Sequence, residues 1–188
     1  MKTSEIRKLF LNYFKGKNHT IVKSDSLIPK NDPTLLFTGA GMNQFKDYFL
    51  GLRTDLKRAT SSQKCLRTGD LDNVGKTPYH HSFFEMLGNW SLGDYFKKDA
   101  IQWSFDFLTS SNEGLGLDPK RLYVTVFEGD EHATKDIDAY NIWKNIFLKY
   151  NLDPAGSIFF LGEASNWWSP GDNGPCGPDS EMFYDVTG

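Results

Sequence analysis

The chain has 188 residues, which is enough for one domain with a sizeable hydrophobic core. Hydrophobic residues make up 39% of the sequence, which argues against a disordered protein, and the net charge of −3 excludes a basic footprint over the whole surface. A local basic patch and an ordinary solvated face are equally good interpretations of one group of residues: Lys46, Arg53, Lys57, Arg58 and Lys64.

The two cysteines, Cys65 and Cys176, lie far apart and form no CxxC motif. This spacing disfavours a disulfide framework and a cysteine zinc site, and it indicates a reduced, cytoplasmic compartment. No apolar run approaches the roughly 20 residues of a membrane span, so no membrane is expected as a partner.

The first part of the chain mixes helical and strand patterns. Apolar residues at helical spacing predict a helix over residues 4–15, and Gly16 ends it. Strands are expected at residues 20–22 and 34–37, and a short helix at 42–50.

Residues 65–89 form the most informative segment, because they read as two strands joined by a polar loop that contains glycine. The first strand is expected to end on Arg67, and the second to begin on His80 and His81. Phe83 and Phe84 should then fall on opposite faces of the second strand. A guanidinium offers a planar fork to phosphate oxygens, and an aromatic ring can stack on a base. The segment therefore predicts a nucleotide site.

The second part of the chain predicts an alternation of helices and strands. A helix begins at Asp99, and a strand over residues 121–127 alternates two sets of side chains. Residues 134–150 are expected to form a helix whose aromatic stripe packs into a core. The remaining strands are expected at 157–161 and 181–185, on either side of a rigid Gly/Pro loop at 166–178. The irregular mixture predicts an α+β fold with an antiparallel sheet, in a single domain.

Two other sites can be weighed from spacing alone. Gly75-Lys76-Thr77 resembles the end of a phosphate-binding P-loop, but Gly69 and Gly75 enclose five residues where that motif needs four, and no apolar helix follows. Adjacent histidines on a strand face opposite sides, so the pair at 80 and 81 does not predict a metal site. No metal ligands are expected.

Four strings in the sequence closely resemble the alanyl-tRNA synthetases, a family of class II aminoacyl-tRNA synthetases. They span residues 31–46, 80–89, 93–97 and 171–178, and the resemblance extends in order over essentially the whole chain. It implies an α+β class II fold, with an antiparallel sheet flanked by helices. It also implies that residues 1–188 are the N-terminal part of an aminoacylation domain that stops before motif 3.

The resemblance also implies roles for individual residues. Arg67 is expected to bind the ATP α-phosphate and to be the catalytic residue, while His81 and Trp168 line the ATP and adenylate site. Phe84, in preference to its neighbour, is expected to stack on adenine, and Met42 and Trp168 to bound a small alanine pocket.

The activity that the resemblance implies is alanine–tRNA ligation. ATP activates alanine to alanyl-adenylate, and the alanyl group passes to the 3′ end of tRNA(Ala). ATP and Mg²⁺ are the implied cofactors, with zinc only in an editing domain that the chain lacks, as it lacks the oligomerisation region. Because the motif 3 arginine is also absent, the alternative is a non-catalytic ATP- or RNA-binding fragment of the same fold.

Overall fold

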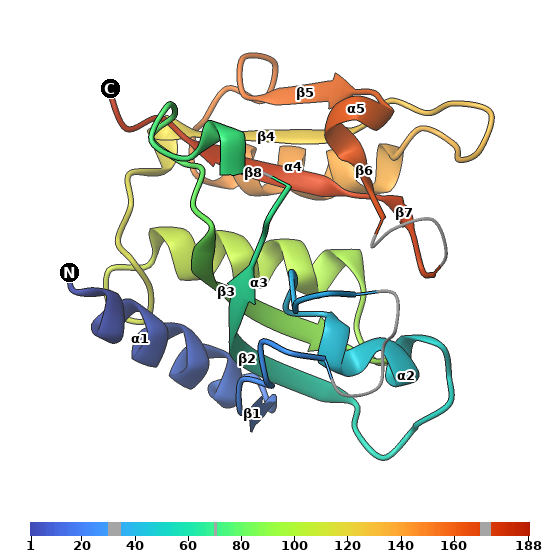
Figure 1. Ribbon diagram of the computed structural model, residues 1–188. Helices are drawn as coiled ribbons and strands as arrows, with labels where there is room; N and C mark the ends of the chain where they lie inside the picture. Colours follow the sequence, from blue (N-terminus) through green and yellow to red (C-terminus); the bar gives the residue numbers. More distant parts are fainter. Residues whose placement is uncertain (30–34, 70, 170–173) are drawn as a thin grey trace. The chain divides into compact units, whose positions relative to one another are not determined.

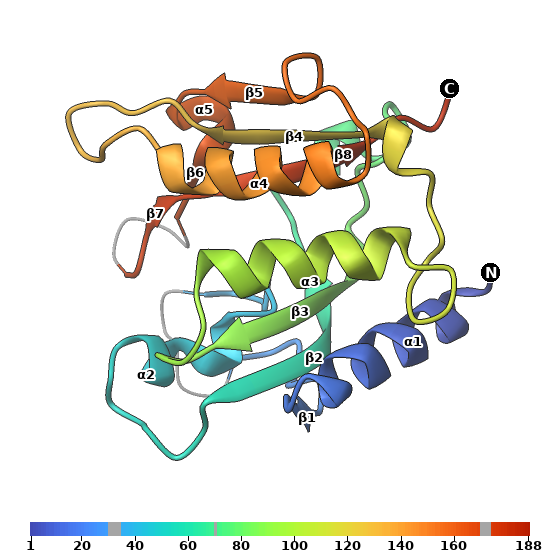
Figure 2. The ribbon, with the colours of Figure 1, turned by 180° about the vertical axis from the view of Figure 1, so that it is seen from behind.

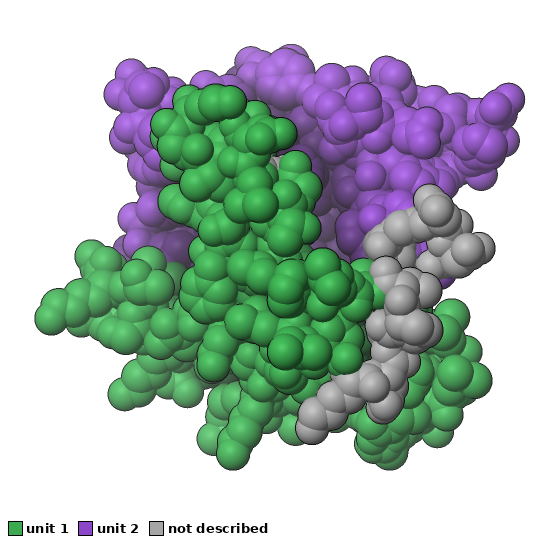
Figure 3. Space-filling view, in the orientation of Figure 1, with its two compact units in different colours: residues 1–94 green, residues 95–188 purple. Residues whose placement is uncertain are grey.

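The computed structural model describes residues 1–29, 35–69, 71–169 and 174–188. The chain divides into two compact units, residues 1–94 and residues 95–188, which Figure 3 shows in green and purple. The expectation of a single domain stays a prediction.

The first unit contains a three-stranded sheet in the order β1-β2-β3. Strands β1 and β2 are parallel, whereas β2 and β3 are antiparallel. The elements of this unit are α1 (Thr3–Gly16), β1 (Thr20–Val22), η1 (Asn43–Phe45), α2 (Lys46–Phe49), β2 (Arg58–Leu66), η2 (Leu71–Asn73) and β3 (Phe83–Ser91).

Helix α1 runs alongside this sheet, as both ribbon views show (Figures 1 and 2). Its apolar stripe buries Phe10 and Phe14, and Glu5 in its first turn accepts a hydrogen bond from the Lys2 N–H at 2.6 Å. Arg7 reaches Glu85 of β3 with two hydrogen bonds, of 2.9 and 2.7 Å. Helix α1 therefore covers the face of β3 that carries the odd-numbered side chains.

The second unit contains a sheet in the order β5-β4-β8 and a separate pair of short strands, β6 and β7. Strand β4 is parallel to β5 and antiparallel to β8, and β6 is antiparallel to β7. The elements are α3 (Lys97–Thr109), η3 (Pro119–Arg121), β4 (Leu122–Phe127), α4 (Ile137–Lys149), β5 (Ile158–Leu161), α5 (Glu163–Asn166), β6 (Trp167–Trp168), β7 (Gly177–Pro178) and β8 (Ser180–Tyr184).

The hydrophobic core of the second unit lies on the α4 face of its sheet. Val124 and Val126 of β4 are fully buried there against Trp143 and Phe147 of α4, and helix α3 adds Phe105. Burying an aliphatic or aromatic side chain of this size stabilises a fold by about 1.5–3 kcal/mol. Helix α5 lies on the opposite face of the sheet, as the two ribbon views show together (Figures 1 and 2).

The predicted α+β class with mainly antiparallel pairing is confirmed, and so are the helices at the start of the chain and in its second part. Residues 35–37 form no strand, so that prediction is wrong for the part of 34–37 that the structure describes. The strand expected to begin on His80 begins instead at Phe83, and the strand before it starts as early as Arg58. The alternation argument against a shared metal ion at the two histidines therefore does not apply. Across the described ranges, no helix combines the length and hydrophobicity that crossing a bilayer requires.

Candidate functional site

Arg67 stands at the point where β2 ends and the loop to β3 begins. Its backbone N–H donates to the Ser82 carbonyl at 2.9 Å, which extends the β2–β3 pairing by one step beyond the strands. Its side-chain Nε donates to the Gly39 carbonyl at 3.0 Å. The side chain is exposed, and its terminal nitrogens form no hydrogen bond with another described residue. One nitrogen therefore fixes the guanidinium, and the other two present donors to an anion.

Phe84 shares a face of the sheet with Arg67. Phe84 is paired with Cys65, two residues before Arg67, and side chains two residues apart point to the same side of a strand. The guanidinium carbon of Arg67 lies 5.3 Å from the centroid of the Phe84 ring. Phe83 belongs to the opposite face, and its side chain is 52% exposed. In this arrangement the guanidinium can bind a phosphate, and the ring beside it can stack on the base of the same nucleotide.

The glycine-bearing segment at residues 38–42 packs beside the same strand ends. The Thr38 carbonyl accepts a hydrogen bond from the Leu66 N–H at 3.0 Å, and the Gly41 N–H donates to Sδ of Met86 at 3.2 Å. A Cβ on Gly41 would stand 3.0 Å from Cζ2 of Trp90, so a larger residue would push the segment away. Met42 is only 3% exposed. The segment thus lies on the sheet face that carries Arg67 and Phe84.

Gln63 holds a second loop at this face, although no motif in the sequence singles it out. Its side chain is fully buried and makes four hydrogen bonds. Oε1 accepts from the Asp25 N–H at 2.8 Å and from Gln44 Nε2 at 3.0 Å, while Nε2 donates to the carbonyls of Asp25 and Lys64. A buried amide with all these partners is a strong local anchor. A lone glutamine in a strand pattern carries no signal of this kind.

The two histidines occupy different positions in the loop before β3. Nδ1 of His80 lies 2.7 Å from Oγ1 of Thr77, and the centroid of its ring lies 4.7 Å from that of Tyr79, with the two rings tilted by 44°. His81 is exposed, and no hydrogen bond or ring contact joins it to another described residue. The structure therefore does not bring His81 onto Arg67 or Phe84, and its expected role in the ATP site stays a prediction. Within the described ranges, no group of three His, Cys, Asp or Glu residues could hold a metal ion.

Ion pairs neutralise part of the suggested basic patch. Arg53 binds Asp55 at 2.9 Å, and Arg58 binds Asp94 at 2.6 Å. The Arg58 hydrogen bond lowers the pKa of Asp94 against a smaller opposing effect of burial. These pairs favour the solvated-face interpretation over a nucleic-acid footprint.

Trp168, the remaining predicted site residue, belongs to the second unit. It is 38% exposed on β6, whereas its neighbour Trp167 packs at 5.8 Å from the fully buried Phe127. The β6–β7 pairing sets Trp168 opposite Gly177. Parts of the four strings, at residues 31–34 and 171–173, lie outside the described residues. The assignment of Trp168 and Met42 to one alanine pocket therefore stays a prediction.

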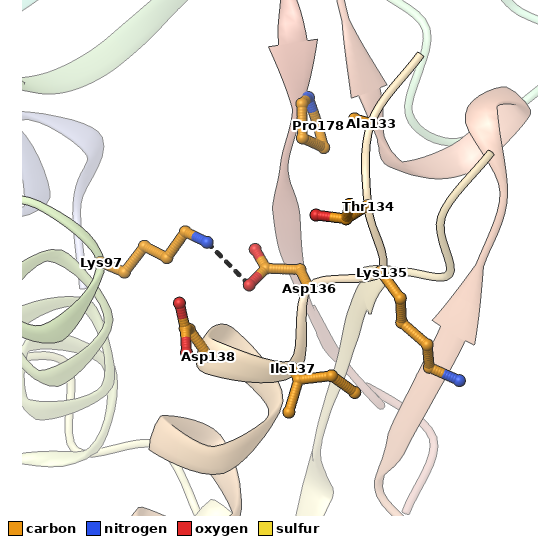
Figure 4. Close-up of a pocket in the computed structure, with 8 residues that line it drawn as sticks. All are labelled: Lys97, Ala133, Thr134, Lys135, Asp136, Ile137, Asp138 and Pro178. Carbon is orange, nitrogen blue, oxygen red and sulfur yellow. Dashed lines mark hydrogen bonds and ion pairs between the residues drawn. The ribbon is translucent and has the colours of Figure 1, made fainter. Parts of the chain in front are cut away.

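A polar hollow of about 250 Å³ in the second unit contains none of the predicted residues (Figure 4). It is lined by Lys97, Ala133, Thr134, Lys135, Asp136, Ile137, Asp138 and Pro178. Asp136 accepts hydrogen bonds from Lys97 Nζ at 2.7 Å and from the Ala139 N–H at 2.9 Å, so it caps α4. The hollow is smaller than the roughly 300–1,000 Å³ of a usual small-molecule site. Because Lys97 and Asp136 are already bound to each other, and Asp136 also caps α4, the hollow does not favour a ligand site.

Comparison with known proteins gives a consistent family. The chain is 52% identical over 187 residues to a protein named alanine–tRNA ligase of Rubrobacter xylanophilus, covering 98% of this chain and 20% of that protein. It is 52% identical to the alanine–tRNA ligase of a Psychrobacter species, covering 98% and 21%, and 50% identical to that of Haemophilus influenzae, covering 97% and 21%. The chain thus spans about a fifth of the length of the curated relatives it matches.

The family model described as tRNA synthetases class II (A) matches residues 5–188, which is nearly the whole chain. The match includes both compact units, and so it includes the Arg67–Phe84 face and the strand that carries Trp168. The chain belongs to the class II tRNA synthetase family.

Proposed function

We propose that this chain forms the ATP-binding and part of the alanine-binding machinery of an alanine–tRNA ligase. The observation that carries the proposal is the arrangement at the end of β2, where Gly39 fixes one nitrogen of the Arg67 guanidinium and Phe84 lies beside it. The high identity to proteins named alanine–tRNA ligase supports alanine and tRNA(Ala) as the substrates. We also propose a cytoplasmic location, because Cys65 and Cys176 are both free thiols.

The proposed first step joins alanine to AMP. A carboxylate oxygen of alanine attacks the α-phosphorus of ATP, the bond from that phosphorus to the bridging oxygen breaks, and pyrophosphate leaves. The nucleophile is already an anion, so no protein base is needed. Arg67 would place two charge-assisted donors where negative charge grows on the α-phosphate, and Phe84 would hold the adenine ring. In the second step, a hydroxyl oxygen of the terminal adenosine of tRNA attacks the alanyl carbonyl carbon and loses its proton, the bond from that carbon to the phosphate oxygen breaks, and AMP leaves.

Magnesium accompanies ATP in such reactions, and its chemistry is to neutralise phosphate charge. Mg²⁺ keeps several waters and binds through one or two carboxylates together with substrate phosphates. Among the described residues, no group of three His, Cys, Asp or Glu side chains could hold the ion without the phosphates of ATP. The role proposed for Arg67 depends on its own geometry.

Amino-acid-dependent exchange of pyrophosphate into ATP tests the proposal in the natural protein that carries these residues. Exchange should depend on alanine and should be much weaker with glycine and serine at equal concentration. Exchange driven by another amino acid and not by alanine would contradict the assignment.

The alternative is a non-catalytic ATP- or RNA-binding module. Calorimetry on residues 1–188, with ATP and with a non-hydrolysable alanyl-adenylate analogue, distinguishes the two when it is combined with an exchange assay on the same chain. We expect weak ATP binding and little turnover from residues 1–188 alone. Robust alanine-dependent exchange by this chain would rule out the non-catalytic alternative.

A further inference from the structure

The strands β6 and β7 are held together, at the end away from the segment that connects them, by a clamp between Asn166 and Asp179. The Asp179 N–H donates to the Asn166 carbonyl at 3.0 Å. In return, Nδ2 of Asn166 donates to the Asp179 carbonyl at 3.2 Å and to Oδ1 of Asp179 at 3.0 Å. Three hydrogen bonds therefore join the residue just before Trp167 to the residue just after Pro178.

Asn166 is entirely buried, so each polar atom of its amide needs a hydrogen-bond partner within the protein. Its Oδ1 atom has no hydrogen-bond partner among the described residues. Leaving a buried acceptor unsatisfied costs about 1–3 kcal/mol, so packing alone would favour an apolar residue at this position. Rotating the amide by 180° would aim Oδ1 at the two acceptors of Asp179, so the observed orientation is the one that those acceptors require.

The pKa of the Asp179 carboxyl depends on its burial and on the hydrogen bond from Asn166. Burial raises the pKa of Asp179, and the hydrogen bond from Asn166 opposes that rise. The neighbouring carboxyl that faces Asp179 belongs to Glu181, whose pKa is raised by partial burial and by the charge of Asp179. The Asn166 amide supplies a neutral donor to Asp179 at this buried position.

The clamp holds strand β6, and with it the side chain of Trp168. Strand β6 has two residues, of which Trp167 packs on Phe127 and the 38% exposed Trp168 is paired with Gly177. A two-residue ladder orders a strand weakly, so the place of the Trp168 indole depends on the hydrogen bonds at the ends of the ladder. We propose that Asn166 is a positioning residue, whose amide sets the location of Trp168. This inference rests on the proposed role of Trp168 in the alanine and adenylate site.

The variant that tests the clamp most sharply is Asn166→Asp, because it keeps the shape and replaces a donor with a second carboxyl. Two carboxyls in contact cannot both ionise cheaply, so the pKa of the pair rises. At pH 6, one shared proton can supply the O–H donor that replaces Nδ2. As the pH rises towards 8.5, loss of the shared proton would leave two carboxylates that repel, which should release the end of β6.

The expected readout is the KM for alanine in alanine-dependent exchange by the natural protein. For Asn166→Asp it should be at least tenfold above wild type at pH 8.5 and within threefold at pH 6. The KM for ATP should change by less than threefold, because alanine has few atoms and loses a larger share of its contacts when one wall moves. Asn145→Asp, which makes the same change at an exposed position of α4, should match wild type at both pH values.

The swap Asn166→Asp with Asp179→Asn re-forms a donor–acceptor pair in the reverse direction and provides a second test if the single variant does not fold. The swap should bring the KM for alanine back to within threefold of wild type at pH 8.5. An unchanged alanine KM in a folded Asn166→Asp protein at pH 8.5, or a swap with no recovery, would overturn the clamp. A wild-type protein without alanine-dependent exchange would instead contradict the proposed function itself.

Discussion

At the scale of single residues, the candidate site depends on which side of a strand each side chain occupies. The register that pairs Cys65 with Phe84 puts Phe84, and not Phe83, on the face of Arg67. The sequence suggested that the two phenylalanines would face opposite sides, but only the register decides which of them meets the arginine. His81 shows the limit of the same reasoning, because it lies in the loop before β3, where alternation does not hold.

Substitution of the two phenylalanines gives a matched test of the adenine contact. Phe84→Ala should raise the KM for ATP in exchange by about 5- to 150-fold, since stacking on an aromatic ring contributes about 1–3 kcal/mol per base. Phe83→Ala removes the same ring from the opposite face and should change that KM by less than threefold. Equal effects of the two changes, or a larger effect at Phe83, would show that the wrong ring was assigned.

The Arg58–Asp94 ion pair predicts a pH dependence of stability. The pKa of Asp94 is lowered in the folded protein, chiefly by the Arg58 hydrogen bond. Its contribution to the free energy of unfolding is therefore present above the unfolded pKa of an aspartate and is lost as the pH falls through the lower, folded value. Denaturant unfolding of Asp94→Asn should differ from wild type at pH 7 and converge with it towards pH 3.

Asp72→Asn is the matched control, because Asp72 is exposed in η2 and forms no ion pair with a described residue. It should show no such convergence. A constant difference between Asp94→Asn and wild type across this pH range would mean that the pair does not contribute through its charge.

At the scale of elements, periodicity was a reliable guide for long segments and a poor one for short ones. Helix α1 and strand β4 follow their apolar patterns closely, because α1 buries one continuous face and β4 buries five of its six residues. Residues 35–37 are apolar and β-prone but form no strand, because the neighbouring Thr38 makes single backbone hydrogen bonds to Leu27 and Leu66 instead of a ladder. Helix α5 has four residues, and strands β6 and β7 have two each. Elements this short depend on contacts with residues distant in sequence, so local periodicity does not predict them.

The close approach of β3 to its own tryptophan makes a prediction at this scale. A Cβ on Gly88 would overlap the Trp90 indole, with Nε1 only 2.8 Å away. Gly88→Ala should therefore lower the free energy of unfolding by about 1–3 kcal/mol, the usual cost of overpacking. It should also disturb Gly41, which packs on the same indole.

Gly16→Ala is the control for this substitution, since no atom lies within 4 Å of the Cβ it would add. Alanine at a compatible position removes freedom from the unfolded chain and should stabilise by about 0.4–1 kcal/mol. Both values come from chemical denaturation followed by circular dichroism. A neutral Gly88→Ala would contradict the tight packing of Trp90 described above.

At the scale of the whole molecule, the class of fold and the family could be inferred from the sequence, whereas the detailed site could not. The α+β class followed from irregular strand and helix patterns, and the match over residues 5–188 agrees with the resemblance of the four strings. Gln63 and Asn166 were not found, because each is a single polar residue whose role depends on partners elsewhere in the chain. Long-range hydrogen bonds of this kind leave no periodic trace in a sequence.

The measurement that tests the central claim most directly is alanine-dependent ATP–pyrophosphate exchange by the natural protein, with wild type compared to Arg67→Ala. A transition-state contact of this kind contributes about 2.7–4 kcal/mol, so the substitution should lower kcat/KM about 10²- to 10³-fold while the protein stays folded. Arg67→Lys should recover only part of that loss, because an ammonium cannot donate to Gly39 and grip a phosphate with the same planar fork. A folded Arg67→Ala protein that exchanges within twofold of wild type, or a wild-type protein that does not respond to alanine, would contradict the account.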